Sequence, residues 1–112
     1  MKQKEELSIK HEAVWRTLQL VEPGQFITGA RLMEHSGIKE RRSFHQIIRD
    51  LRRAGYPIGS SKQPETRGFF VIRDQSALDM TLAGLHSAAL DMLVTAKRIE
   101  RAYMDDQHGR LF

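Results

Sequence analysis

The clearest helical pattern in the sequence is the run KERRSFHQIIRDLRRAG at residues 39–55. Its apolar side chains recur at spacings of three, one and three residues, which places them on one side of a helix. They are Phe44, Ile47, Ile48 and Leu51. At about 100° per residue, the opposite side collects Arg42, Gln46, Arg49 and Arg53. The pattern therefore predicts an amphipathic helix over residues 40–54, which Gly55 terminates.

Two shorter helices are predicted before this one. Apolar residues at three- and four-residue spacings indicate a first helix over residues 8–21, capped by Ser8 and stopped by Pro23. Thr28 is the expected N-cap of a second helix over residues 29–35, and Gly37 can take the left-handed conformation at its end. The residues expected on the apolar faces are Ile9, Ala13, Val14, Leu18 and Val21 in the first helix and Ala30, Leu32 and Met33 in the second.

A hairpin and a long helix are predicted after it. Residues 56–60 and 69–72 have the composition of strands, and the polar stretch 61–68 between them indicates a flexible hairpin tip. Asp74 or Ser76 then caps a final helix that is expected to run to about residue 104, with a frayed tail after it.

The final helix carries an apolar stripe with alternating spacings of four and three residues, which is typical of a coiled coil. The stripe consists of Leu78, Leu82, Leu85, Ala89, Met92, Ala96, Ile99 and Tyr103. A domain of this size cannot easily cover so long a helix, so part of the stripe is expected to meet another chain. Whether that chain is a second copy or a different protein stays open.

The basic charge is concentrated in one third of the chain. The whole sequence of 112 residues has a formal net charge of +4. Residues 39–73 hold nine basic and three acidic groups, a net of +6, whereas the other 77 residues hold nine basic and eleven acidic groups, a net of −2. Such a concentration is the electrostatic signature of a surface that meets phosphate.

Composition and motifs exclude several classes of protein. With no cysteine, the chain has no disulfide framework, no thiol catalysis and no Cys-ligated metal site. No catalytic or phosphate-binding motif is present and the histidines are scattered, so we expect no enzyme activity, no cofactor and no metal. The charged start lacks an apolar signal core, and no segment is expected to span a membrane. A cytoplasmic protein with no membrane partner is predicted.

Residues 11–73 resemble a winged helix-turn-helix domain. The turn over residues 34–38 and the run over residues 51–58 are similar to the N-terminal DNA-binding module of biotin repressor-type proteins, in which a glycine ends the recognition helix and a Gly-aromatic step, here Gly68-Phe69, begins the last strand. The resemblance implies an α+β fold of three helices and a wing of two or three strands, to which this chain adds the long C-terminal helix. No biotin-binding or ligase domain follows, so the resemblance does not imply that activity.

A recognition helix over residues 40–54 assigns roles to the polar side chains. Arg can bond guanine through O6 and N7, and Gln can bond adenine in the same forked manner. Arg42, Gln46 and Arg49 are therefore the expected base readers. Phosphate contacts, which position without reading sequence, are expected from Lys39, Arg41, Arg52 and Arg53 on or beside the helix. From the wing, Lys62 and Arg67 are expected to reach the neighbouring minor groove or the backbone.

These expectations combine into a dimeric transcriptional regulator that binds double-stranded DNA. We expect a flexible N-terminus (1–7), a winged domain (8–73), a helix for dimerisation or partner binding (74–104) and a flexible tail (105–112). Two alternatives stay open. The arginine-rich helix face can be only a solvated surface, or the chain can be a protein-interaction module, for example a phage or mobile-element replication accessory protein.

Overall fold

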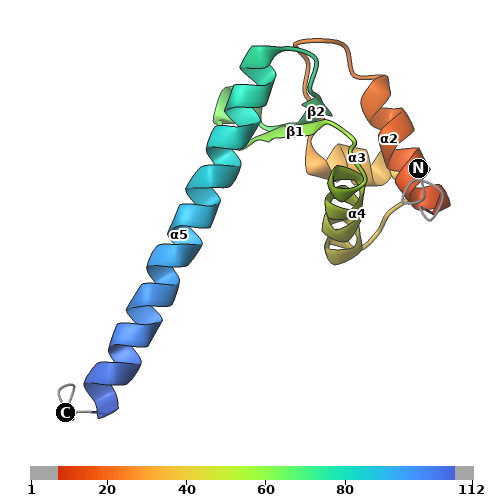
Figure 1. The fold of residues 1–112 in the computed structure, drawn as a ribbon. Coiled ribbons are helices and arrows are strands. Elements are labelled where there is room, and N and C mark those ends of the chain that lie inside the picture. Colours follow the sequence, from red (N-terminus) through yellow and green to blue (C-terminus); the bar gives the residue numbers. More distant parts are fainter. Residues whose placement is uncertain (1–7, 108–112) are drawn as a thin grey trace. The chain divides into compact units, whose positions relative to one another are not determined.

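The computed structural model describes residues 8–107, and its elements follow the predicted order (Figure 1). Four α-helices and one two-stranded sheet occur in this part of the chain, which confirms the α+β class. The elements are α2 (Ile9–Gln19), α3 (Gly29–Ser36), α4 (Arg41–Arg53), β1 (Ile58–Ser61), the short 3-10 helix η1 (Pro64–Thr66), β2 (Gly68–Val71) and α5 (Gln75–Gln107). The expected flexible N-terminus and the last five residues of the expected tail lie outside the described residues.

The predicted helix caps are confirmed. Ser8 Oγ accepts from the His11 backbone N–H at 3.4 Å, and Thr28 Oγ1 accepts from that of Arg31 at 3.3 Å. Asp74 Oδ1 accepts from the Ala77 N–H at 2.8 Å, so Asp74 is the capping side chain at the start of α5. Gly37 ends α3 with φ of 70°, a left-handed conformation in which glycine avoids the steric cost of a side chain. Local sequence therefore sets where these helices begin and end.

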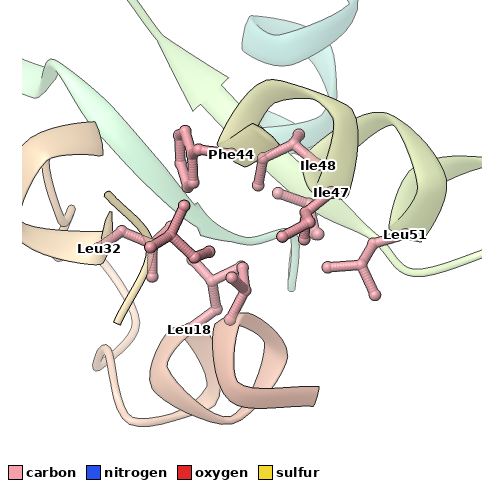
Figure 2. Packing of buried hydrophobic residues seen from close by; sticks show 9 residues of the cluster. Leu18, Leu32, Phe44, Ile47, Ile48 and Leu51 are labelled. Carbon is pink, nitrogen blue, oxygen red and sulfur yellow. The ribbon is translucent and has the colours of Figure 1, made fainter. Parts of the chain in front are cut away.

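The core forms where α4 lays its apolar face on α2 and α3. All four predicted apolar residues of α4 are buried, and Phe44 is completely inaccessible. Figure 2 shows Leu18 of α2 and Leu32 of α3 gathered with Phe44, Ile47, Ile48 and Leu51 in one cluster. Burying a large apolar side chain stabilises a fold by roughly 1.5–3 kcal/mol relative to exposure, so this face of α4 contributes much of the stability.

The sheet is an antiparallel hairpin whose register pairs Ile58 with Val71 and Ser61 with Gly68. A single bridge adds a third extended segment: Ile27 and Phe69 exchange backbone hydrogen bonds of 3.0 and 2.7 Å. Gly68 is required at this point. Its φ is 138°, and a Cβ there would lie 2.4 Å from the Ile27 carbonyl oxygen.

The structure corrects three local expectations. Ile9 and Ala30 were expected on apolar faces, but both are exposed, Ile9 to 83%. Ile9 lies in the first turn of α2, outside the core, to which α2 contributes Val14 and Leu18. The hairpin tip contains the short helix η1, which was not expected, and the Ser61 and Thr66 hydroxyls hydrogen-bond there at 2.7 Å. Finally, α5 continues through residues 105–107, where fraying was expected, because its last turns contain no glycine or proline to stop it.

The chain divides into two compact units, with the boundary between Thr81 and Leu82 inside α5. The first turns of α5 belong to the first unit, where the buried Thr81 hydroxyl accepts from the Ser60 backbone N–H at 3.2 Å. In the second unit, α5 is exposed over nearly its whole described length.

Phe44→Ala is expected to lower the free energy of unfolding by about 3–5 kcal/mol, because it leaves a cavity at the centre of the cluster. Leu20→Ala is the control: Leu20 is 82% exposed, and its truncation should change stability by no more than about 0.5 kcal/mol. Urea unfolding followed by circular dichroism measures both. Equal effects of the two substitutions would contradict the assigned core.

Candidate nucleic-acid interface

The side of α4 that faces away from the core is exposed and basic. Because the apolar residues hold one side of the helix against α2 and α3, the orientation of the other side is fixed. The exposed side chains there are Arg41, Arg42, His45, Gln46, Arg49 and Arg53. The structure thus brings five of the predicted site residues onto one helix surface, the basic face of α4, and Lys39 is exposed in the turn before it.

Asp50, which the sequence analysis did not select, is the hub of the hydrogen bonds on this face. Its Oδ1 accepts from Gln46 Nε2 at 2.8 Å, and its Oδ2 lies 2.9 Å from His11 Nε2. Gln46 Oε1 in turn accepts from an Arg49 NH2 group at 2.7 Å. A line of polar contacts therefore runs from α2 through Asp50 to two of the expected base readers.

The ring of His11 is oriented by the cap of its own helix. The Ser8 backbone N–H donates to His11 Nδ1 at 3.2 Å, and Ser8 Oγ lies 2.7 Å from the same nitrogen. Since Nδ1 accepts, these contacts assign the proton of a neutral ring to Nε2, which then donates to Asp50. Hydrogen bonds from His11 and Gln46 lower the pKa of Asp50 below its ordinary value, and partial burial opposes them only in part. The carboxylate is therefore ionised at neutral pH.

Arg52 has a structural position. It is half-buried, and its Nε donates to the Ile58 carbonyl at 3.0 Å while an NH2 group donates to Ser60 Oγ at 3.1 Å. Burial lowers the pKa of its guanidinium, but an arginine keeps its charge at any physiological pH. These bonds join the end of α4 to β1, a role that differs from the phosphate contact expected for it.

The two remaining cations of the predicted site lie on the hairpin and not on α4. Lys62 follows β1 and Arg67 precedes β2, and both are exposed on either side of η1. The 3-10 helix η1 forms the turn between them.

The predicted apolar stripe on α5 is exposed beyond its first turns. Leu78 is half-buried in the first unit, but Met92, Ile99 and Tyr103 are each at least 60% exposed. Leu82 and Leu85 are exposed to 39% and 44%, and Ala89 and Ala96 are exposed as well. Further exposed apolar residues lie beside the stripe or on the opposite side of α5: Leu90, Leu93, Val94 and Met104.

By length and composition, α5 is long and apolar enough to cross a membrane. This corrects the expectation that no segment of the chain could do so. One such helix is weak evidence for a membrane span, and the cytoplasmic location stays a prediction.

Comparison with known proteins adds no name to this site: no family model, no curated protein and no solved structure matches the chain. The geometry and charge of α4 and the exposed stripe of α5 are therefore the features from which function is inferred.

Acidification is expected to destabilise the wild-type protein more than it destabilises the Asp50→Asn variant. Because the folded pKa of Asp50 is lowered from the ordinary 3.8, its carboxylate stabilises the fold fully above that pH and loses this effect as pH falls through the lowered value. Urea midpoints measured at about pH 5 and at about pH 2 should therefore differ less in Asp50→Asn than in the wild type.

Glu40→Gln is the control, because it removes a carboxylate at the opposite end of α4 from Asp50. The difference between its urea midpoints at the two pH values should equal that of the wild type. An undiminished acid response in Asp50→Asn would contradict a stabilising role for the His11 and Gln46 contacts.

Proposed function

We propose that this chain is a winged-helix protein that binds double-stranded DNA with α4 in the major groove. The observation that carries the proposal is the division of α4 into a fully buried apolar face and an exposed basic face within a segment of net charge +6. The major groove of B-DNA admits an α-helix, and a recognition helix must pack one side on its domain while offering the other side to the bases. The order of α2, α3, α4 and the β1–β2 hairpin is the order of a winged helix.

The side chains divide into two roles in this proposal. Arg42, Gln46 and Arg49 read base edges, because forked donors suit guanine and a carboxamide suits adenine. Lys39, Arg41 and Arg53 bind phosphates beside them, and Lys62 and Arg67 reach the backbone or the neighbouring minor groove from the hairpin. Phosphate contacts of this kind supply affinity and register, whereas the base contacts supply sequence preference.

The proposed regulator is a homodimer through α5. A stripe with four-three spacing is the pattern by which two helices pair in a coiled coil, and its exposed members extend from Leu82 to Tyr103. Formal charge is sparse there: Asp91 is the one charged side chain between Met80 and Ala96. A second copy offers an identical apolar stripe, and two-fold pairing would present two α4 helices to a symmetric site. Transcriptional regulation is the role that fits such a dimer.

The second candidate is a protein-interaction module, for example a replication accessory protein of a phage or mobile element. It is favoured by exposed apolar side chains of α5 that lie outside the coiled-coil seam, namely Leu90, Leu93 and Val94. In that case α5 meets a different protein and the basic face of α4 is a solvated surface.

Binding of duplex DNA is expected to be steeply salt-dependent. If α4 and the hairpin neutralise several phosphates, the dissociation constant should rise by roughly a thousandfold or more between about 50 and 200 mM salt. Fluorescence anisotropy with labelled duplex measures it. Arg49→Ala should weaken binding, whereas Arg98→Ala, an identical charge change on an exposed residue of the second unit, should not. No binding at low salt would refute the proposal.

Met92→Glu is expected to convert a dimer into a monomer, because it places a charge in the middle of the paired stripe. Ser87→Glu, which adds the same charge at an exposed position off the stripe, should leave the dimer intact. Sedimentation equilibrium at micromolar concentrations gives the mass of each. A monomeric wild-type protein would favour the interaction module over the dimer.

A further inference from the structure

A negative charge lies at the edge of the surface that would meet DNA, on the side that contacts α2. Asp50 is the only acidic residue within α4, whose sequence is RRSFHQIIRDLRR. Its side chain is 32% exposed and lies one helical turn from Gln46, beside Arg49 in the sequence. A carboxylate here repels phosphate, so its presence in a DNA-binding face calls for a compensating role.

The contacts of Asp50 hold it on two helices at once. Oδ1 is bonded to Gln46 on α4, and Oδ2 is bonded to His11 on α2, which is only 14% exposed. Ser8 fixes the His11 ring in turn. The carboxylate therefore has little freedom to rotate, and its position is set by the packing of α2 on α4.

This fixed carboxylate determines which way the Gln46 amide points. A carboxylate only accepts hydrogen bonds, so the Gln46 NH2 group must face Asp50 and its carbonyl oxygen must face away from it. That oxygen accepts from Arg49, which holds the guanidinium beside it. Gln46 then keeps one unused N–H, which can donate to adenine N7, and one unused oxygen lone pair, which can accept from the adenine N6 amino group. Arg49 keeps its other donors for a guanine or a phosphate.

We infer that Asp50, held in place by His11, is a specificity-determining positioning residue that orients Gln46 and Arg49 for base reading. This inference rests on the proposed DNA-binding function and adds the device that sets sequence preference within it. Asp50 makes no contact with the bases in this account. It lowers affinity for DNA in general through its charge and raises discrimination between sequences through the side chains it orients.

The test compares Asp50→Asn with Glu40→Gln. The second substitution removes an equal charge from an exposed residue just before α4, whose carboxylate accepts a hydrogen bond from Ser43. An asparagine at position 50 offers a donor where one acceptor stood, so its two terminal atoms cannot each accept a hydrogen bond, as those of Asp50 do from Gln46 and His11. The preferred duplex is first selected with the wild-type protein. Dissociation constants are then measured for that duplex and for its single base-pair variants.

Both substitutions should tighten binding to unrelated duplex. Only Asp50→Asn should reduce discrimination between the preferred duplex and its single base-pair variants, by about tenfold. The reduction should occur only at the base pairs where Gln46→Ala and Arg49→Ala also reduce it. Discrimination is a ratio of two constants from one preparation, so a change in the folded fraction cancels. His11→Ala should reduce discrimination at the same base pairs, and His11→Gln, which retains a donor toward Asp50, should restore part of it.

Two failures are distinguishable. If the wild-type protein discriminates between duplexes and Asp50→Asn discriminates equally well, the inference is wrong and the proposed function stands. If the wild-type protein binds no duplex at low salt, the proposed function and this inference fall together.

Discussion

Burial of one side of α4 is the constraint on which the rest of this structure depends. Phe44 and Leu51 are almost completely inaccessible, and they pack with Leu18 and Leu32 from the two preceding helices. Any roll of α4 about its axis would expose these side chains and bury arginines, and an unpaired charge is expensive to bury. The hydrophobic contact that stabilises the domain therefore also fixes which polar groups face outward, so that core and candidate interface are two consequences of one pattern.

Local signals in the sequence were sufficient for the elements of the first unit. Caps such as Ser8, Thr28 and Asp74 and the left-handed Gly37 act within a few residues, so they can be recognised without tertiary information. Periodicity identified the buried side of α4 for the same reason. Ile9 shows the limit of this reasoning, because a residue can have the correct spacing and still lie outside the core.

The features that escaped prediction depend on contacts between distant segments. His11 and Asp50 are 39 residues apart, and nothing in either local sequence indicates that they meet. The one local signal from which the Gln46–Asp50 contact could have been found is their spacing of four residues within α4. The hydrogen bond from Arg52 to the Ile58 carbonyl likewise could not be predicted, because it depends on the return of β1 to the end of α4. The polar contacts that organise the candidate site thus arise from the tertiary fold.

The two units carry complementary features. The first unit holds a basic surface on which hydrogen bonds join Arg49 to Gln46 and Gln46 to Asp50. The second holds an exposed apolar stripe on α5 with few charges. A protein that binds DNA through one unit and pairs through the other would use both, which is why we propose a dimeric DNA-binding regulator instead of a module that uses α5 alone.

Selection from a pool of random duplex DNA tests this account most directly. The account predicts enrichment of a sequence with adenine and guanine at the positions read by Gln46 and Arg49, arranged as an inverted repeat because the dimer is two-fold symmetric. Enrichment of single, unrepeated sites would contradict the dimer. A pool that stays random after repeated rounds at low salt would contradict sequence-specific DNA binding itself.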